Sequence, residues 1–181
     1  MLAKKRTRSQ SFRGRQPTQN RIIAMLEEIG KWKSYVSVLR KKAKKQLRSE
    51  ELRGEFRPDL VMVPALGRKT SSKVVEVEAT VNNHTISKSL FSLLYYMARH
   101  ERVKGYLVVP TSGQRFALDR VIAIKEIIRR YRRGGKGKRR TVPIVVLTFD
   151  QVRRYHTDLV GHTQSSGTRK GRLRKFKGFD D

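Results

Sequence analysis

Three carboxylates lie close together in the stretch RPDLVMVPALGRKTSSKVVEVEAT, residues 57–80: Asp59, Glu76 and Glu78. Glu76 and Glu78 belong to a strictly alternating run, which places both on one face of a strand and the intervening valines on the other. Two side chains spaced in this way stand roughly 6–7 Å apart. Because Asp59 opens the preceding apolar run, a hairpin between the two strands would bring its carboxylate to the same place.

Carboxylates that face one another repel unless a cation lies between them. A divalent ion such as Mg²⁺ or Mn²⁺ fits this need, because it takes one or two carboxylates together with waters and phosphate oxygens. Such an ion also lowers the pKa of a bound water and stabilises charge on a scissile phosphate. Two simpler interpretations stay open: pairing with nearby Lys or Arg, and a strand face on which alternating glutamates simply meet water.

The composition points to an anionic partner. The chain has 181 residues, enough for one ordinary domain, and carries 43 Lys and Arg against 15 Asp and Glu, a formal charge of +28. Such an excess repels itself in a compact fold unless something anionic neutralises it, which favours nucleic acid ahead of an anionic membrane. The absence of cysteine excludes disulfides, thiolate zinc sites and cysteine catalysis.

Targeting signals give a simple expectation for location. The longest apolar runs are far shorter than a membrane span, and the basic N-terminus lacks the apolar stretch of a secretory signal. We therefore expect a soluble, cytoplasmic protein that associates with nucleic acid and has no membrane partner.

Basic segments frame the chain. Residues 1–20 are predicted to be a disordered basic arm, residues 21–160 a single α/β domain, and residues 161–181 a basic tail. A further basic cluster inside the domain has the density of a loop that tracks phosphates. It comprises Arg129, Arg130, Arg132, Arg133, Lys136, Lys138, Arg139 and Arg140.

Hydrophobic periodicity supplies the elements that must position the carboxylates. We expect helices over 18–32, 86–99 and 117–131 and from 150 onward, and strands over 34–39, 59–64, 73–80, 105–110 and 142–149. The charged segment 40–55 fits either a short helix or a loop. Early strands in succession favour hairpins and later strands separated by helices favour parallel crossovers, so the sum is a mixed sheet with helices on both faces.

The element order and the letters RPD…KVVEVEAT together resemble the PD-(D/E)xK nuclease superfamily, the restriction-endonuclease-like group with an α-β-β-β-α-β core. Pro58-Asp59 matches the first half of its motif and Glu76-Val77-Glu78 the second, and the resemblance covers about residues 20–150. It implies a Mg²⁺- or Mn²⁺-dependent endonuclease in which Asp59, Glu76 and Glu78 hold the metal. Duplex or branched DNA would be the substrate, and the protein would act as a homodimer or within a larger nucleoprotein assembly.

The chain departs from the motif at Glu78, where the family usually has a lysine. Glu78 is then a third ligand or a general base, or a displaced lysine replaces the missing one, with Lys88 ahead of Lys73. The remaining alternative is an inactive nuclease fold that binds DNA or RNA structurally, including in a ribosome-associated role. The family often carries a glutamate on its first helix, which makes Glu27, ahead of Glu28, a weaker candidate.

Other features favour ordinary structural roles. Tyr95 and Tyr96 are expected in the core or at its boundary rather than as a stacking platform. The residues Asn82-Asn83-His84 are expected to form the turn into the following helix. Thr111-Ser112-Gly113 has amides and hydroxyls that suit a phosphate, but it lacks the glycine spacing of a nucleotide loop.

Overall fold

The computed structural model describes residues 15–39, 58–65, 70–131 and 142–165. Its elements are α2 (Arg15–Trp32), β1 (Tyr35–Leu39), β2 (Leu60–Pro64), β3 (Ser72–Val77), α4 (Asn83–Arg99), β4 (Val103–Val109), a 3₁₀ turn η2 (Thr111–Gly113), α5 (Gln114–Tyr131), β5 (Ile144–Thr148) and α6 (Phe149–Ser165). In this described part, none of the helices has the length and apolar character needed to cross a membrane.

The five strands form one mixed sheet in the order β1-β2-β3-β4-β5. Neighbouring strands are antiparallel from β1 to β3 and parallel from β3 to β5, as expected for early strands in succession and later strands separated by helices. Leu60 pairs with Val75 and Met62 with Lys73. Continuing this register by one step sets Asp59 opposite Glu76.

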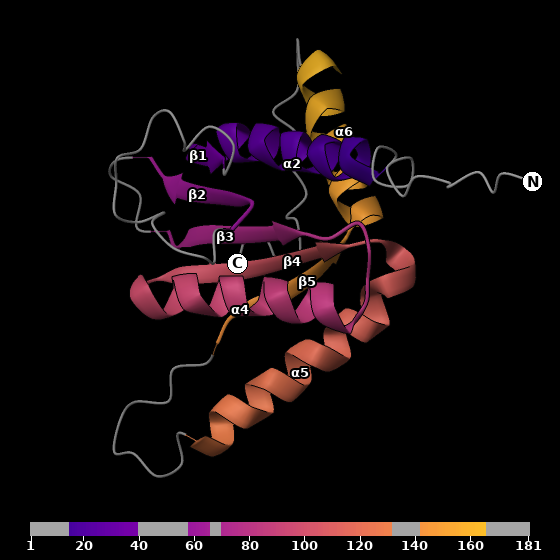
Figure 1. Ribbon diagram of the computed structural model, residues 1–181. Coiled ribbons are helices and arrows are strands. Elements are labelled where there is room, and N and C mark those ends of the chain that lie inside the picture. Colours follow the sequence, from indigo (N-terminus) through magenta and orange to yellow (C-terminus); the bar gives the residue numbers. More distant parts are fainter. Residues whose placement is uncertain (1–14, 40–57, 66–69, 132–141, 166–181) are drawn as a thin grey trace, which may run out of the picture.

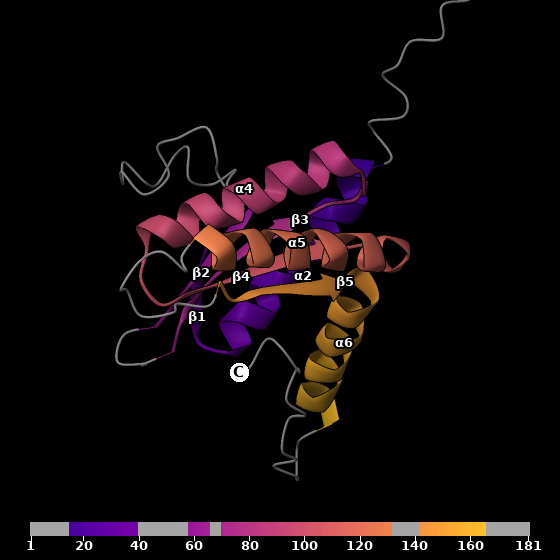
Figure 2. The ribbon, with the colours of Figure 1, turned by 90° about the horizontal axis from the view of Figure 1, so that it is seen from below.

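Helices cover both faces of the sheet (Figures 1 and 2). On one face α2 and α6 pack against a cluster that includes Leu60, Val75 and Tyr106. On the other face α4 and α5 pack against a cluster that includes Val74 and Leu107. Successive residues of β3 therefore alternate between two cores, and this fixes the face on which each polar side chain of that strand lies.

The domain limits differ from those expected. Helix α2 begins at Arg15, inside the segment assigned to the N-terminal arm, and α6 continues to Ser165, past the predicted end at 160. The arm and tail residues beyond these helices, together with segment 40–55, lie outside the described residues.

Helical periodicity over 117–131 predicts an inward face of Leu118, Val121, Ile122, Ile124, Ile127 and Ile128, and this prediction is wrong for three of them. Ala117 and Val121 are buried, whereas Leu118, Ile122 and Ile127 are 39%, 62% and 53% exposed. The physical reason is that a single helix contacts the sheet over a limited arc, and the apolar residues of α5 spread over more than that arc.

Local signals position α4 beside β3. Asn82 is its N-cap: Oδ1 accepts a hydrogen bond from Thr85 N at 2.9 Å, and Thr85 Oγ1 accepts one from Asn82 N at 3.2 Å. This capping box satisfies two backbone donors at the helix start. Gly113 supports the same region, because a Cβ there would lie 2.3 Å from Cγ2 of Val81.

Candidate active site at the sheet edge

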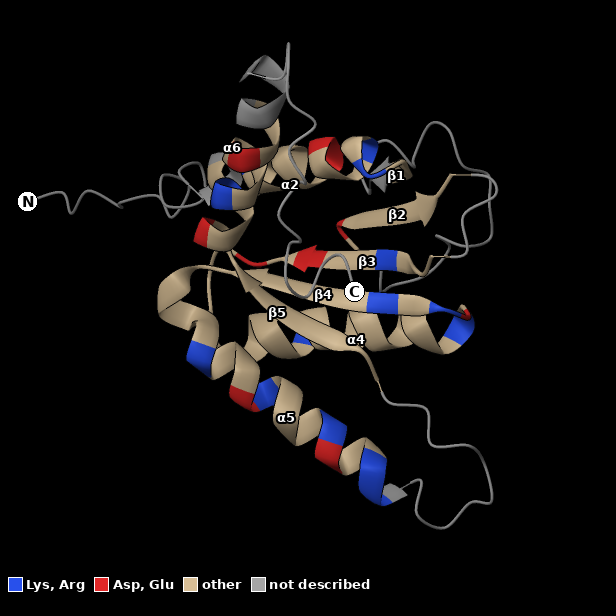
Figure 3. Cartoon of the chain, turned by 180° about the vertical axis from the view of Figure 1, so that it is seen from behind, with Lys and Arg blue, Asp and Glu red and all other residues tan. Residues whose placement is uncertain are grey.

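One edge of the sheet collects the polar residues. The parallel strands β3, β4 and β5 end there, and the antiparallel strand β2 begins there. Acidic segments at the start of β2 and the end of β3 lie side by side (Figure 3). Ligands of open α/β sheets commonly bind at the carboxyl ends of the strands.

Asp59 is held by the backbone of β3 and by a side chain of α2. Its Oδ2 accepts a hydrogen bond from Val77 N at 3.0 Å and one from Gln19 Nε2 at 3.3 Å. The same Gln19 nitrogen donates to Val77 O at 2.6 Å. A single amide group therefore lies between a carboxylate oxygen and a carbonyl oxygen, a position that suits a positive centre.

Glu76 is almost completely buried, with 5% of its surface exposed. Burial, and next the negative charge of Asp59, raise the pKa of Glu76 well above its usual value. The charge of Glu78 and a hydrogen bond with Asp59 raise this pKa further. Glu76 therefore tends to keep its proton and share it with Asp59, as paired carboxyl groups do.

Glu78 follows the end of β3 and is positioned by α4. Ser89 Oγ donates a hydrogen bond to Glu78 Oε1 at 2.5 Å, and Glu78 N donates to Val108 O at 2.9 Å. These contacts fix both the backbone and one carboxylate oxygen. Glu78 thus lies close enough for its charge to raise the pKa of Glu76, while its own carboxylate is hydrogen-bonded to Ser89.

A second serine of α4 lies beside the acid pair. Ser92 is 4% exposed, and hydrogen bonding from it lowers the pKa of Glu76 in part. Its Oγ nevertheless has no hydrogen bond of full geometry within the described structure. We therefore treat the Ser92–Glu76 contact as weak, which leaves a buried hydroxyl only partly satisfied next to two carboxyl groups.

The two lysines considered as replacements for the motif lysine lie elsewhere. Lys88 is exposed on α4, and no hydrogen bond or ion pair joins it to another described residue. Lys73 is buried on the opposite face of β3 from Glu76, where its Nζ donates to Tyr106 Oη at 3.4 Å. Neither lysine accompanies the acid pair in this arrangement.

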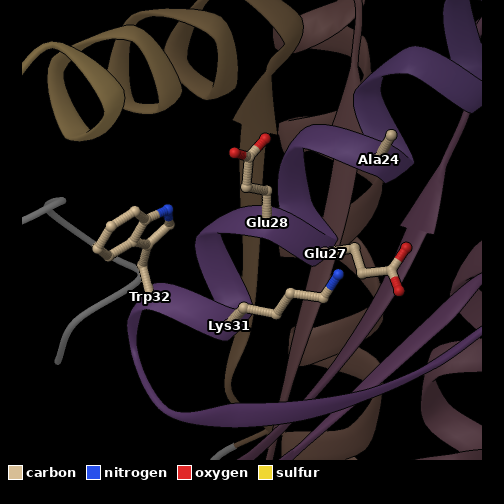
Figure 4. A pocket seen from close by; sticks show the side chains of 5 residues that line it. All are labelled: Ala24, Glu27, Glu28, Lys31 and Trp32. Carbon is tan, nitrogen blue, oxygen red and sulfur yellow. The ribbon is translucent and has the colours of Figure 1, made fainter. Parts of the chain in front are cut away.

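The glutamates of α2 are also apart from the pair. Glu27 and Glu28 line a surface pocket with Ala24, Lys31 and Trp32 near the end of the helix (Figure 4). Glu28 Oε2 lies 2.7 Å from Nε2 of His156 on α6. The α2 residue that reaches Asp59 is Gln19, two helical turns before Glu27.

The predicted phosphate-tracking cluster is described only in part. Arg129 and Arg130 end α5 with side chains 62% and 74% exposed, and both contact Glu126 Oε1, at 2.8 and 3.6 Å. The remaining members, Arg132 to Arg140, lie outside the described residues. Their role in nucleic-acid binding stays a prediction.

The segment after β4 is tied to α6 at the same sheet edge. Thr111 Oγ1 donates a hydrogen bond to Asp150 Oδ2. This bond, and then the charge of Arg153, hold the pKa of Asp150 below its usual value. The hydroxyl considered for a phosphate is therefore engaged by a carboxylate in this structure.

The oxygen atoms at the acid pair suit a hard divalent cation. Asp59, Glu76 and the Val77 carbonyl supply donors of the type that Mg²⁺ and Mn²⁺ prefer. The Gln19 amide N–H group lies between Asp59 Oδ2 and Val77 O. The Ser92 hydroxyl beside the acid pair has its hydrogen-bonding capacity only partly satisfied. Nevertheless, the described residues contain no group of three or more His, Cys, Asp or Glu side chains arranged to hold a metal ion. A triad that includes Glu78 stays a prediction.

Gln19, Ser89 and Ser92 are absent from the sequence-based site. Each had a detectable signal, because a polar residue on the apolar stripe of a helix must find a polar partner in the core. Gln19 lies three residues before Ile22, on the same face of α2, and Ser89 and Ser92 lie on the buried face of α4.

The fold defines an α/β protein with a five-stranded mixed sheet and helices on both faces. Comparison of the chain with protein-family models, with curated proteins and with solved structures finds no match. Function is therefore inferred from the site itself.

Proposed function

We propose that the protein is a metal-dependent endonuclease that hydrolyses phosphodiester bonds of DNA. The observation that supports this most is the acid pair: Glu76 is buried beside Asp59 at the carboxyl edge of the sheet in a chain of formal charge +28. The largest influences on the pKa of Glu76 are its burial, the neighbouring acids Asp59 and Glu78, and Ser92. Strongly perturbed carboxyl groups at such an edge are typical of functional sites.

Each residue has a distinct part in the proposed reaction. Asp59, Glu76 and the carbonyl of Val77 would hold Mg²⁺ or Mn²⁺, and the ion would supply a positive charge for the scissile phosphate and a bound water of lowered pKa. Glu76 would have to release its proton to solvent to serve as a ligand, and a cation between the carboxylates would favour this by offsetting the charge of Asp59. Gln19 would also have to move its amide away from Val77 O, because that carbonyl oxygen would then bind the cation instead of the Gln19 N–H.

Glu78 takes the role that the motif lysine would otherwise fill. Ser89 holds its Oε1, so the carboxylate is fixed beside Glu76. In the proposed step Glu78 accepts a proton from the attacking water as the water oxygen bonds to phosphorus. The P–O bond to the leaving oxygen breaks, and that oxygen takes a proton from solvent.

The test is nicking of a supercoiled plasmid by the full chain with Mg²⁺, with Mn²⁺ and with chelator. We expect cleavage only with metal, loss of detectable cleavage in Glu76→Gln, and a loss of about a hundredfold or more in Glu78→Gln, as for removal of a general base. Glu27→Gln and Glu28→Gln are matched controls on α2 and should cleave like the wild type. Wild-type nicking in Glu76→Gln would remove the acid pair from the mechanism.

A second function is favoured by the placement of the lysines. Because Lys73 and Lys88 do not accompany the acid pair, a fold that binds DNA or RNA without cutting it is the alternative. This alternative predicts salt-dependent binding with no metal-dependent nicking of any substrate. Linear, branched and single-stranded DNA, tested side by side, separate the two functions.

A further inference from the structure

Helix α4 carries a straight stripe of basic and aromatic side chains on its exposed side. The stripe consists of His84, Lys88, Phe91, Tyr95 and Arg99, spaced by four, three, four and four residues. This spacing keeps all five on one helical face. The helix contains no acidic residue, so α4 adds no negative charge beside the stripe.

The aromatic members are unusually accessible. Phe91 is 59% exposed and Tyr95 is 37% exposed, whereas Tyr96 is in the core. The guanidinium carbon of Arg99 lies 4.7 Å from the centroid of the Tyr95 ring. This contact steadies the ring and sets a positive charge against it.

The stripe lies on the outward side of α4, opposite the core residues Ile86, Leu90 and Leu93. Ser89 and Ser92 face Glu78 and Glu76 and are buried, whereas Phe91 and Tyr95 face outward. Ser92 borders the stripe beside Tyr95, but Ser92 and Glu76 are both buried, so a ligand on the stripe lies beside the acid pair and not on it. Such a ligand is a flanking part of a long polymer rather than the scissile bond itself.

We propose that this face of α4 binds an unpaired stretch of nucleic acid, with Phe91 and Tyr95 stacking on separate bases while Lys88 and Arg99 contact phosphates. The inference rests on the proposed function, which makes the polymer a nucleic acid, and it adds that the bound stretch is single-stranded. Bases in a duplex hide their flat faces in the stack, so exposed aromatic rings have stacking partners only where bases are unpaired.

The spacing of the rings supports separated bases. Phe91 and Tyr95 are four residues apart, which is about 6 Å along a helix axis. Stacked bases within one strand of a duplex are about 3.4 Å apart. Two neighbouring bases can therefore meet both rings only after they leave the stack, as they do in single strands and at branch points.

The test measures binding of labelled oligonucleotides by the full chain in the Glu76→Gln background, so that cleavage does not interfere. Phe91→Leu with Tyr95→Leu keeps apolar side chains but removes both rings. We expect affinity for a mixed-sequence single strand to fall roughly tenfold or more, and affinity for the duplex of the same sequence to change less than twofold. Parallel DNA and RNA strands identify which polymer supplies the bases.

Trp32→Leu is the matched control, because Trp32 is a 51% exposed aromatic residue on α2, beside Glu27, Glu28 and Lys31. It should leave single-strand affinity unchanged. A second readout introduces Phe91→Trp into a Trp32→Phe background, in which the single indole should be quenched by single strands and not by duplex. Unchanged fluorescence on single-strand binding would contradict the stacking.

Two outcomes overturn the proposal. Equal losses on single strands and duplex would show general phosphate binding, and no loss on either would leave this face as a protein-binding surface. A wild type that binds single strands through α4 but never nicks any substrate would support this inference and reject the proposed hydrolysis. Metal-dependent nicking, with no effect of the ring substitutions on binding, would support the proposed hydrolysis and reject this inference.

Discussion

Strand β3 carries two buried ionisable residues three positions apart, on opposite faces of the sheet. Lys73 and Glu76 are each 5% exposed. Lys73 Nζ lies 5.3 Å and 5.4 Å from the ring centroids of Tyr35 and Tyr106, and it donates to the Tyr106 hydroxyl. Glu76 faces Asp59 and Glu78 instead.

The two surroundings have opposite effects on charge. Ring faces and a hydroxyl oxygen attract the positive charge of Lys73, as expected of a residue that stabilises its core. The acids around Glu76 oppose its negative charge, so the folded protein disfavours the form that a metal would need. A site whose charge becomes favourable only after a ligand binds is typical of function rather than of stability.

The largest expected effect is on thermal stability with metal, and it tests the functional role of Glu76. Mn²⁺ at a hundred times its dissociation constant should stabilise the wild type by about 2.7 kcal/mol, because the ion binds only the folded state. Asp59→Asn with Glu76→Gln should remove this gain, whereas Glu27→Gln with Glu28→Gln replaces two carboxyl groups elsewhere and should keep it. Melting curves at constant ionic strength measure the difference, and a metal-independent wild-type curve would reject the cation site.

The next effect concerns Lys73. Lys73→Met keeps the aliphatic stem but removes the ammonium group from two rings, so we expect a loss of about 1–2 kcal/mol. Urea unfolding at neutral pH measures it. Lys31→Met, at an exposed position of α2, should stay within about 0.5 kcal/mol of wild type. Equal effects of the two substitutions would show that Lys73 gains nothing from its rings.

A smaller effect, of opposite sign, is expected for Glu76→Gln without metal. The folded state raises the pKa of Glu76 above its usual value of 4.5, so folded chains bind more protons and wild-type stability falls as pH rises above that value. The variant should therefore be more stable than wild type at pH 8, by about 1.4 kcal/mol for each unit of the pKa difference, and should lose this advantage below pH 4.5. A stability difference that does not vary with pH would contradict the buried acid pair.

The smallest effects compare two buried serine hydroxyls, one on each face. Neither Ser37 Oγ nor Ser92 Oγ has a hydrogen bond of full geometry within the described structure. Ser37→Ala and Ser92→Ala should each change stability by about 1 kcal/mol or less without metal. Ser92→Ala alone should weaken the Mn²⁺ effect, roughly tenfold in dissociation constant, because it removes a group that favours ionised Glu76. Equal metal responses would place Ser92 outside the site.

The sequence was sufficient to place the acids because strand parity is strict. Residues two apart share a face, so Glu76 and Glu78 had to lie together, and the hairpin brought Asp59 beside them. The same rule already separated Lys73 from Glu76, since an odd interval changes the face. Lys88 lies opposite the stripe of Ile86, Leu90 and Leu93 and is exposed.

Other parts of the site depended on tertiary packing. The start of α2 at Arg15 has no strong local signal in a basic segment, and without it Gln19 cannot be placed on a helix. The orientation of Glu78 toward Ser89 depends on how α4 lies across the sheet, and neither residue's local pattern encodes that angle.

The hairpin of β2 and β3 makes the core of the site local in the chain, which has a kinetic consequence. Val77 and Asp59 are 18 residues apart, whereas Gln19 and Val77 are 58 apart. Closing the longer loop costs about 1 kcal/mol more conformational entropy. The hairpin should therefore bring the two acids together before α2 docks and Gln19 reaches Val77. Pulsed hydrogen exchange during refolding should then show the Val77 amide protected ahead of the amides of α2.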